Sequence, residues 1–585
     1  MKKLCAFFRR VYASPPGRFL AALALAAALF FAASCVTDIA YYNNDDTNIA
    51  AALSGELSGT PYPAHPFINC LLGNAVSFCY RILPAVPWWL VFQLVFALTG
   101  LAVTGACILA VSQRKGLPLI LAVVFYGVYA LAFVLYTLLL VTFTLTSAVL
   151  GAAAVSLLLS MDDAASGRQK TGRYALSALL MGAAFLFRNS SGLSLLPFYF
   201  GAICCRAALL LKNKAGKQRL IKLMAFALAS LMLFFGLIAV HNWGLTYYNA
   251  PEFAAFDEAR GRYLDYPVDS YSDNPSLYES VGWDAELYSM VMQWFYMDGR
   301  VTAENLNAIL DGSQKGGLLS PAEALADLNA FLSGQPFARY SIAVCFIALL
   351  LFAALAAFHR EGRLPLLLAL VMLLGGGALV MYLLLSGRLV LRVFQLVAIP
   401  AGASVLLLGL TALPEGAYGK RFPAVRSGIS VCLLLALLFS SYKCARIAVS
   451  YDSAGMLQKS RALIAYALAN PDKIYIRDTR AANNVDAVAT YPDKKPTNLL
   501  DWGGTSAYTG AKELQLDKYG LRPFTADVFF RENVYFITEP GSRDYKSFCS
   551  YLNTEYQGAS LKLTDVVADG VAVYSVTQNP MEEPK

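Results

Sequence analysis

Two adjacent aspartates, Asp45 and Asp46, lie directly after the first long apolar segment of the chain. That segment, residues 18–37, is long enough to cross the hydrocarbon core of a bilayer. Carboxylates are costly in lipid, so we expect both acids at or just above the membrane surface. A carboxylate there can take a proton from a hydroxyl as a general base, and two together can bind a divalent metal. The simpler interpretation is a solvated loop in which Asp46 caps a helix that begins at Thr47.

Three arginines occupy turns that we expect on the same face of the membrane as the two aspartates. Arg188 lies between two predicted spans, and Arg388 and Arg392 flank another turn. Arginine at the membrane surface is costly unless it meets an anion, and a guanidinium binds phosphate through two parallel hydrogen bonds. Any one of them could instead reach lipid headgroups or pair with a local acid. Taken together with the aspartates, the three arginines predict one anion-binding site on the outer face.

Two further residues are weaker candidates for binding a substrate on this face. His65 shares a loop with Asp45 and Asp46, although a lone loop histidine is more often a surface or capping residue. Arg260 follows a predicted span within an acidic and aromatic stretch. The cysteines form no CxxC motif, and the three histidines are scattered, which argues against a Cys/His metal site. Cys70 and Cys79 share the first outer loop, where they could form a disulfide.

The composition of the chain is that of a membrane protein, so membrane-spanning helices must position these residues. Of the 585 residues, 57% are hydrophobic and 15% are charged, whereas a soluble protein carries about 25% charged residues. Residues 117–160 contain no charge and must form two spans. A signal peptide at 18–37 is the alternative for the first segment, but its length and the absence of a clear cleavage site favour a span. We predict eleven transmembrane helices, near residues 18–37, 87–111, 117–135, 137–160, 172–188, 191–211, 219–242, 338–358, 363–386, 389–411 and 427–448.

The distribution of basic residues predicts the orientation of the chain. Lys and Arg concentrate in alternate loops, above all in 206–222, whereas residues 243–337 hold four basic and fourteen acidic side chains. The positive-inside rule then places the N-terminus in the cytoplasm and the C-terminus outside. The net charge of +8 reflects this topology and does not indicate nucleic-acid binding.

We therefore predict an α-helical polytopic membrane domain, residues 1–449, with outer loops 38–86 and 243–337. Within these loops, residues 47–54 and 67–83 predict short helices, and 243–337 predicts several more. A C-terminal extracytoplasmic α/β domain follows at 450–585. Its expected elements are strands at 473–478 and 533–538, a helix at 544–555 and a closing hairpin over 560–576.

Several motifs are missing from the sequence. It contains no P-loop, no Gly-x-Gly-x-x-Gly after a strand and no His-Glu-x-x-His. The predicted cytoplasmic loops are also too short for a nucleotide-binding domain. These observations disfavour an enzyme that uses nucleotides or nucleotide sugars inside the cell.

The layout resembles the GT-C superfamily of polytopic membrane glycosyltransferases, and it is also similar to bacterial membrane proteins that carry an Asn-Asp-Asp loop. The shared marks are one or two acids in the first outer loop, here Asp45 and Asp46, many spans, and an outer C-terminal domain. The resemblance implies inverting transfer of a sugar from a polyprenyl-phosphate-linked donor to a glycan, lipid or protein acceptor of the cell envelope. Asp45 or Asp46 would match the acid that activates the acceptor. The cofactor is left open, and a divalent metal (Mg or Mn) is an option only because two adjacent carboxylates can bind one. The adjacent pair leaves open which acid acts.

Two other functions are compatible with the sequence. A glycan polymerase or ligase of another membrane fold would depend on the large loop 243–337 and on Arg260 or Arg262. A lipid or solute transporter would need charged or helix-breaking positions at mid-membrane, and Gly375 to Gly377 is the only strong break within a predicted span.

Overall fold

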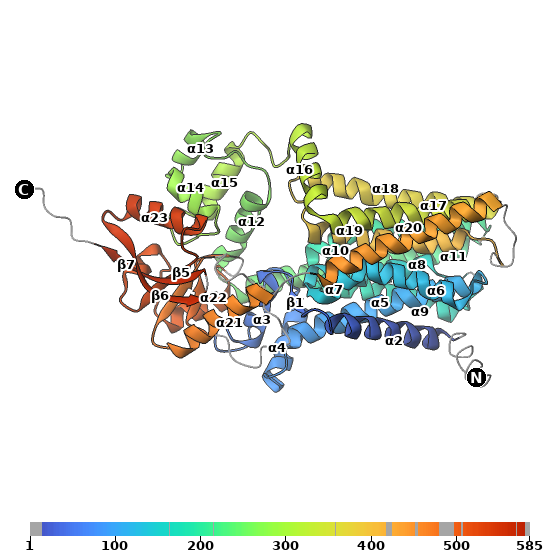
Figure 1. The fold of residues 1–585 in the computed structure, drawn as a ribbon, viewed down its shortest axis with the longest axis horizontal. Coiled ribbons are helices and arrows are strands. Elements are labelled where there is room, and N and C mark those ends of the chain that lie inside the picture. The colour runs from blue at the N-terminus through green and yellow to red at the C-terminus, as the bar shows by residue number, and fades with distance from the viewer. Residues whose placement is uncertain are drawn as a thin grey trace, which may run out of the picture.

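The computed structural model describes residues 14–162, 164–214, 216–356, 359–416, 424–450, 454–478, 496–504, 507–568 and 570–578. A bundle of long helices forms one half of the molecule, and shorter helices with a β-sheet form the other half (Figure 1). The two halves meet at one end of the bundle, where β1, α3 and α4 lie (Figure 1).

Helices occupy all eleven predicted spans. Among the described residues, nine are long and apolar enough to cross a membrane: α2 (Pro15–Ser34), α5 (Trp88–Arg114), α6 to α7 (Leu119–Leu139), α10 (Asn189–Lys212), α11 (Lys217–Tyr248), α17 (Pro336–Ala356), η2 with α18 (Arg360–Leu385), α19 (Leu391–Ala412) and α20 (Ala424–Val449). Two more complete the bundle, the shorter apolar α8 (Phe143–Leu159) and α9 (Gly167–Phe187), which begins with several basic residues. The predicted polytopic helical fold is confirmed.

The bundle has buried central helices and outer helices that expose apolar side chains. Every residue of α8 is buried, and α19 is nearly as enclosed. The outer helices instead expose large apolar side chains, such as Phe31 on α2, Met232 on α11 and Leu374 on α18. Exposed apolar faces of this size suit lipid as the surrounding solvent.

The first outer loop contains the two-residue strand β1 (Ala40–Tyr41) and the helices α3 (Asn44–Ser54) and α4 (Cys70–Ile82). The predicted helix 47–54 starts too late, because Asn43 is the N-cap and both aspartates lie in the first helical turn. The interpretation of Asp46 as a helix cap is therefore wrong. The option of a disulfide between Cys70 and Cys79 is also excluded, since both lie on α4 as free thiols.

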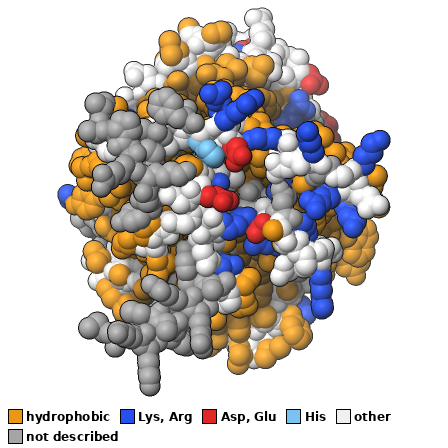
Figure 2. Space-filling model, turned by 90° about the vertical axis from the view of Figure 1, so that its right-hand side faces the viewer, with side chains coloured by type: hydrophobic (Ala, Val, Ile, Leu, Met, Phe, Trp, Pro, Cys, Tyr) orange, Lys and Arg blue, Asp and Glu red, His pale blue; other side chains and the backbone are white. Residues whose placement is uncertain are grey.

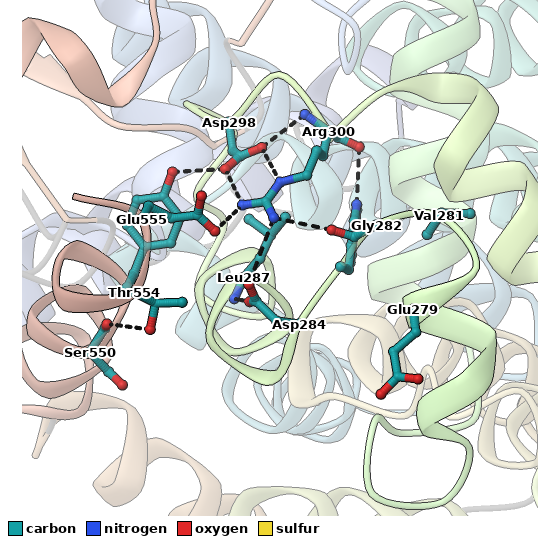
Figure 3. A network of polar contacts seen from close by, with 12 residues as sticks. Glu279, Val281, Gly282, Asp284, Leu287, Asp298, Arg300, Ser550, Thr554 and Glu555 are labelled. Atoms are coloured by element: carbon teal, nitrogen blue, oxygen red, sulfur yellow. Dashed lines mark hydrogen bonds and ion pairs between the residues drawn. The ribbon is translucent and has the colours of Figure 1, made fainter. Parts of the chain in front are cut away.

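The second outer segment folds into the expected short helices: α12 (Pro251–Asp265), α13 (Pro275–Glu279), α14 (Ala285–Val291), α15 (Ala303–Gly312) and α16 (Pro321–Gly334). It shares one hydrophobic core with the C-terminal domain, in which Phe295 packs against Trp502 at 5.4 Å between ring centres. Arg300 links the two across this contact, because it bonds to Asp298 and also pairs with Glu555 of the C-terminal domain (Figure 3).

The C-terminal region contains a five-stranded sheet in the order β4-β3-β5-β7-β6. Strands β3 (Ile474–Arg477), β4 (Leu499–Asp501) and β5 (Val534–Thr538) are parallel, and β6 (Ala559–Ala568) and β7 (Val571–Gln578) form the closing antiparallel hairpin. Helices α21 (Ala454–Ala469), α22 (Gly510–Lys518) and α23 (Arg543–Glu555) pack with it. The predicted α/β domain is confirmed, although β4 is too short to give a sequence signal.

Basic side chains gather at the end of the bundle that lies away from the β-sheet. Figure 2 looks onto this end and shows Lys and Arg clustered on one side of it. The acidic outer loops and the sheet lie at the opposite end (Figure 1). This polarity agrees with the pattern from which the orientation was predicted.

Candidate functional site

A short parallel ladder fixes the first outer loop against the bundle. Ala40 and Tyr41 of β1 pair with Leu140 and Val141 of β2, the link between α7 (Leu135–Leu139) and α8. The N–H of Tyr42 extends the ladder by donating to the carbonyl of Val141 at 2.9 Å. Because α3 begins two residues later, its first turn is held beside the start of α8. The two aspartates therefore lie at the end of the bundle and not in a free loop.

Asp46 is fully enclosed and ties three helices together. Its Oδ1 accepts hydrogen bonds from Trp89 Nε1 at 3.2 Å, Gln93 Nε2 at 2.9 Å and the N–H of Phe143 at 3.2 Å. Burial raises the pKa of Asp46 to about 7, although hydrogen bonds from Gln93 and the Phe143 N–H act in the opposite direction. These contacts give Asp46 a structural position that joins α3 to α5 and α8.

The raised pKa of Asp46 makes stability depend on pH. Between its ordinary value of 3.8 and about 7, the folded protein binds a proton that the unfolded chain does not bind. Stability therefore falls as pH rises through this window, by about 1.4 kcal/mol per pH unit. We expect the thermal unfolding midpoint of the purified protein to fall from pH 5 to pH 8. Asp46→Asn, which mimics the protonated acid, should flatten this dependence, and an unchanged slope in the variant would contradict the assignment.

Asp45 has a different environment from its neighbour. Its Oδ2 accepts from Arg392 Nη1 at 3.2 Å and from Asn43 Nδ2 at 2.6 Å. Arg392 lies in the first turn of α19, where a cation is disfavoured by the helix dipole, and its side chain stays 28% exposed. An anion next to Arg392 offsets this unfavourable interaction, and the carboxylate of Asp45 is that anion.

Arg188 lies at the junction of α9 and α10 and interacts electrostatically with Arg392 and Asp45. Its Nη1 donates to Thr144 Oγ1 at 2.6 Å and its Nε to Ser190 Oγ at 2.9 Å. The guanidinium also lies 5.3 and 5.0 Å from the ring centres of Phe67 and Phe143. These neighbours fix the orientation of the Arg188 guanidinium.

The charges around Arg188 form one group, which we call the outer charge cluster: Asp45, Arg188, Asp265, Arg388 and Arg392. Arg188 interacts electrostatically with the other four members, and Arg388 forms an ion pair with Asp265 at the end of α12. The cluster contains three arginines and two aspartates, so it holds a surplus of one positive charge. A site of this kind favours an anion such as a phosphate.

A cavity opens where the turn before Arg392 meets α16. Its volume is about 340 Å³, and its walls come from α16, from the end of α18 and from the turn that leads into α19. Tyr42, one residue before Asn43, and Leu391, one residue before Arg392, are among the lining residues. Among the described residues that line it, none belongs to the outer charge cluster, so the cavity is linked to Arg392 only through its neighbour Leu391.

The structure places the two weaker candidates in supporting positions. His65 is buried, and its Nδ1 accepts from the N–H of Phe67 at 3.3 Å; burial lowers its pKa to about 3, so the ring is neutral. Arg260 forms an ion pair with Asp257 and lies 5.3 Å from the ring centre of Trp294. His65 therefore supports Phe67, whose ring lies against the guanidinium of Arg188. Arg260 makes its ion pair within the second outer segment.

The carboxylates of Asp45 and Asp46 both face nitrogen donors. The described part of the chain contains no group of three or more His, Cys, Asp and Glu placed to hold a metal ion. The carboxylate of Asp46 faces N–H donors, and that of Asp45 faces a guanidinium. A divalent metal (Mg or Mn) at this pair remains a prediction of the sequence.

Comparison with known proteins gives structural neighbours only. No family model matches the sequence, and no curated protein is significantly similar to it. ArnT from Cupriavidus metallidurans bound to undecaprenyl phosphate aligns over 97% of this chain and 99% of its own, at 15% identity and a TM-score of 0.39. The arabinofuranosyltransferase AftD from mycobacteria aligns over 96% of this chain but only 40% of its own, at 14% identity and a TM-score of 0.44. Identities and TM-scores this low assign no role to any residue of this chain.

Proposed function

We propose that this protein is a membrane glycosyltransferase that uses a polyprenyl-phosphate-linked sugar as its donor. The observation that carries the proposal is the pairing of Asp45 with Arg392, together with the charge of Arg188, at one end of the helical bundle. The carrier that we propose is of the same class as the undecaprenyl phosphate named for ArnT. The acceptor binds at the face that carries the C-terminal domain.

The reaction follows from the two kinds of charge in the site. The donor phosphate binds Arg392 and Arg188, and this releases Asp45 from its resting ion pair. Asp45 takes the proton of an acceptor hydroxyl, whose oxygen forms a bond to the anomeric carbon from the side opposite the phosphate. The bond from that carbon to the phosphate oxygen breaks, and its electron pair leaves with the polyprenyl phosphate. The arginines stabilise the charge gained by the leaving group, and the sugar inverts at the anomeric carbon.

Asp45 is a better general base than Asp46 because of its surroundings. Asp45 is held by a partly exposed arginine that an incoming phosphate can draw away. Asp46 receives three donors from enclosed groups of α5 and α8 and has no exposed surface. We therefore assign proton transfer to Asp45 and the fixing of α3 to Asp46.

Recognition of the lipid phosphate tests this function without knowledge of the acceptor. Undecaprenyl phosphate should raise the thermal unfolding midpoint of the purified protein in detergent in a saturable manner. Undecaprenol, which lacks the phosphate, should have little effect, since it cannot engage the arginines. Equal stabilisation by the two lipids would show that the site recognises only the apolar chain and would overturn the proposal.

A further inference from the structure

A groove on the side of the bundle has no role in the proposed reaction. Its volume is about 930 Å³, and it lies between α9 and α11 with α10 at its base. Small side chains face each other across it, Ala175 and Ala178 on α9 and Ala225 and Ala229 on α11. Because alanines cannot fill the space between two helices, the groove stays open toward the surrounding membrane.

The charges in this groove are confined to one end. Its cations are Lys170, Arg206, Arg219 and Lys222, and none of the described residues that line it is acidic. Arg206 is buried and donates to the carbonyl of Met161 at 3.2 Å, whereas Arg219 and Lys222 are exposed. This end belongs to the face on which Lys and Arg gather in Figure 2. The positive-inside pattern accounts for basic residues at this end, but not for an open groove that leads away from them.

The rest of the groove is apolar and has the depth of one lipid leaflet. The lining residues of α11 run from Arg219 to Leu233, a length of about 21 Å at 1.5 Å per residue. Half of the hydrocarbon core is about 15 Å, and the headgroup layer adds several more. Tyr174 and Phe226, whose ring centres are 4.6 Å apart, lie between the basic end and the apolar end. One headgroup and one acyl chain therefore match the groove in polarity and in length.

We propose that this groove is a binding site for an anionic glycerophospholipid of the leaflet at the basic end of the bundle. The phosphate and any further negative charge of the headgroup contact the four cations, and one acyl chain lies along Ala178, Ala225, Ala229 and Leu233. The site lies at the opposite end of the bundle from the outer charge cluster, so it does not depend on the proposed reaction.

Native mass spectrometry of the full-length protein tests the site, with palmitoyl-oleoyl phosphatidylglycerol and the matching phosphatidylcholine as probes. Each cation near a membrane surface contributes about fivefold to the binding of an anionic lipid. The triple variant Lys170→Gln, Arg219→Gln, Lys222→Gln should therefore bind phosphatidylglycerol on the order of a hundredfold more weakly. The control variant Arg168→Gln, Lys212→Gln, Lys217→Gln removes the same charge at the same end but outside the groove lining, and it should bind like wild type.

A second variant separates the groove from general surface charge. Ala229→Phe keeps every cation and fills the apolar part, so it should also weaken phosphatidylglycerol binding while the unfolding midpoint stays close to wild type. Three results would each overturn the proposal. The two triple variants could lose phosphatidylglycerol binding equally, or the wild-type protein could bind both phospholipids equally. Millimolar inorganic phosphate could also displace phosphatidylglycerol.

Discussion

Replacing Asp45 with Asn is expected to lower the rate of sugar transfer by about 10²–10⁴-fold, the usual contribution of a general base. The amide keeps the size of the side chain and one oxygen that can accept from Arg392 and Asn43. It cannot take a proton from the acceptor. Binding of undecaprenyl phosphate should persist, because the arginines remain in place and lose an internal competitor. Transfer from a radiolabelled polyprenyl-phosphate sugar, measured in membranes that contain the native acceptor, gives the rate.

Asp46→Asn is the matched control, because it makes the same chemical change at the adjacent residue. Asp46 binds donors from α5 and α8 and faces no exposed surface, so its variant should keep most of the activity. A rate for Asp45→Asn close to wild type would refute the assignment of the base. If Asp46→Asn alone lost activity while folding normally, the roles of the two acids would be reversed.

Replacing Arg392 with Ala is the second change for which we expect a large effect. Hydrogen bonds between charged partners contribute about 1.5–3 kcal/mol, so affinity for undecaprenyl phosphate should fall about 10–150-fold. Stability should change little, because the Arg392 side chain is 28% exposed and its pair with Asp45 is partly solvated. Titration of the purified protein with undecaprenyl phosphate, followed by thermal unfolding, measures both quantities.

Arg392→Lys keeps the charge but loses the paired donors of the guanidinium. Its affinity for undecaprenyl phosphate should therefore lie between those of the wild type and Arg392→Ala. Arg262→Ala is the useful comparison on the outer loop, since a polymerase or ligase that depends on that loop would lose activity there. Loss of activity in Arg262→Ala with normal lipid binding in Arg392→Ala would favour that alternative over the proposed glycosyltransferase.

The sequence predicted the elements of this fold because membrane helices carry a strong local signal. Each span is a long apolar segment, and the limits of α10 and α18 differ from prediction by at most two residues. The strands β3 and β5 were also predicted, since buried apolar runs between turns mark them. The start of α3 was missed, because the signal for a helix N-terminus at Asp46 competes with an equally good one at Asn43.

The candidate site was only partly predictable, since its partners come from distant parts of the chain. Arg188 and Arg392 lie at the ends of predicted spans, where an arginine is costly without an anionic partner. The sequence therefore indicated an anion beside each, and in the structure both interact with Asp45. The partners of Asp46 were missed, although Gln93, an amide within an apolar span, is a signal that could have been used. Asp265 gave no signal, because its pairing with Arg388 depends on how α12 folds back over the bundle.

The central claim is that Arg188 and Arg392 hold the phosphate of a lipid carrier next to Asp45. A cryo-EM structure of the protein with undecaprenyl phosphate tests it most directly. We expect phosphate density within about 3 Å of at least one guanidinium nitrogen of Arg188 or Arg392, with Asp45 released from Arg392. Phosphate density at the basic end of the bundle, or an intact Asp45–Arg392 pair with the lipid bound elsewhere, would contradict the claim.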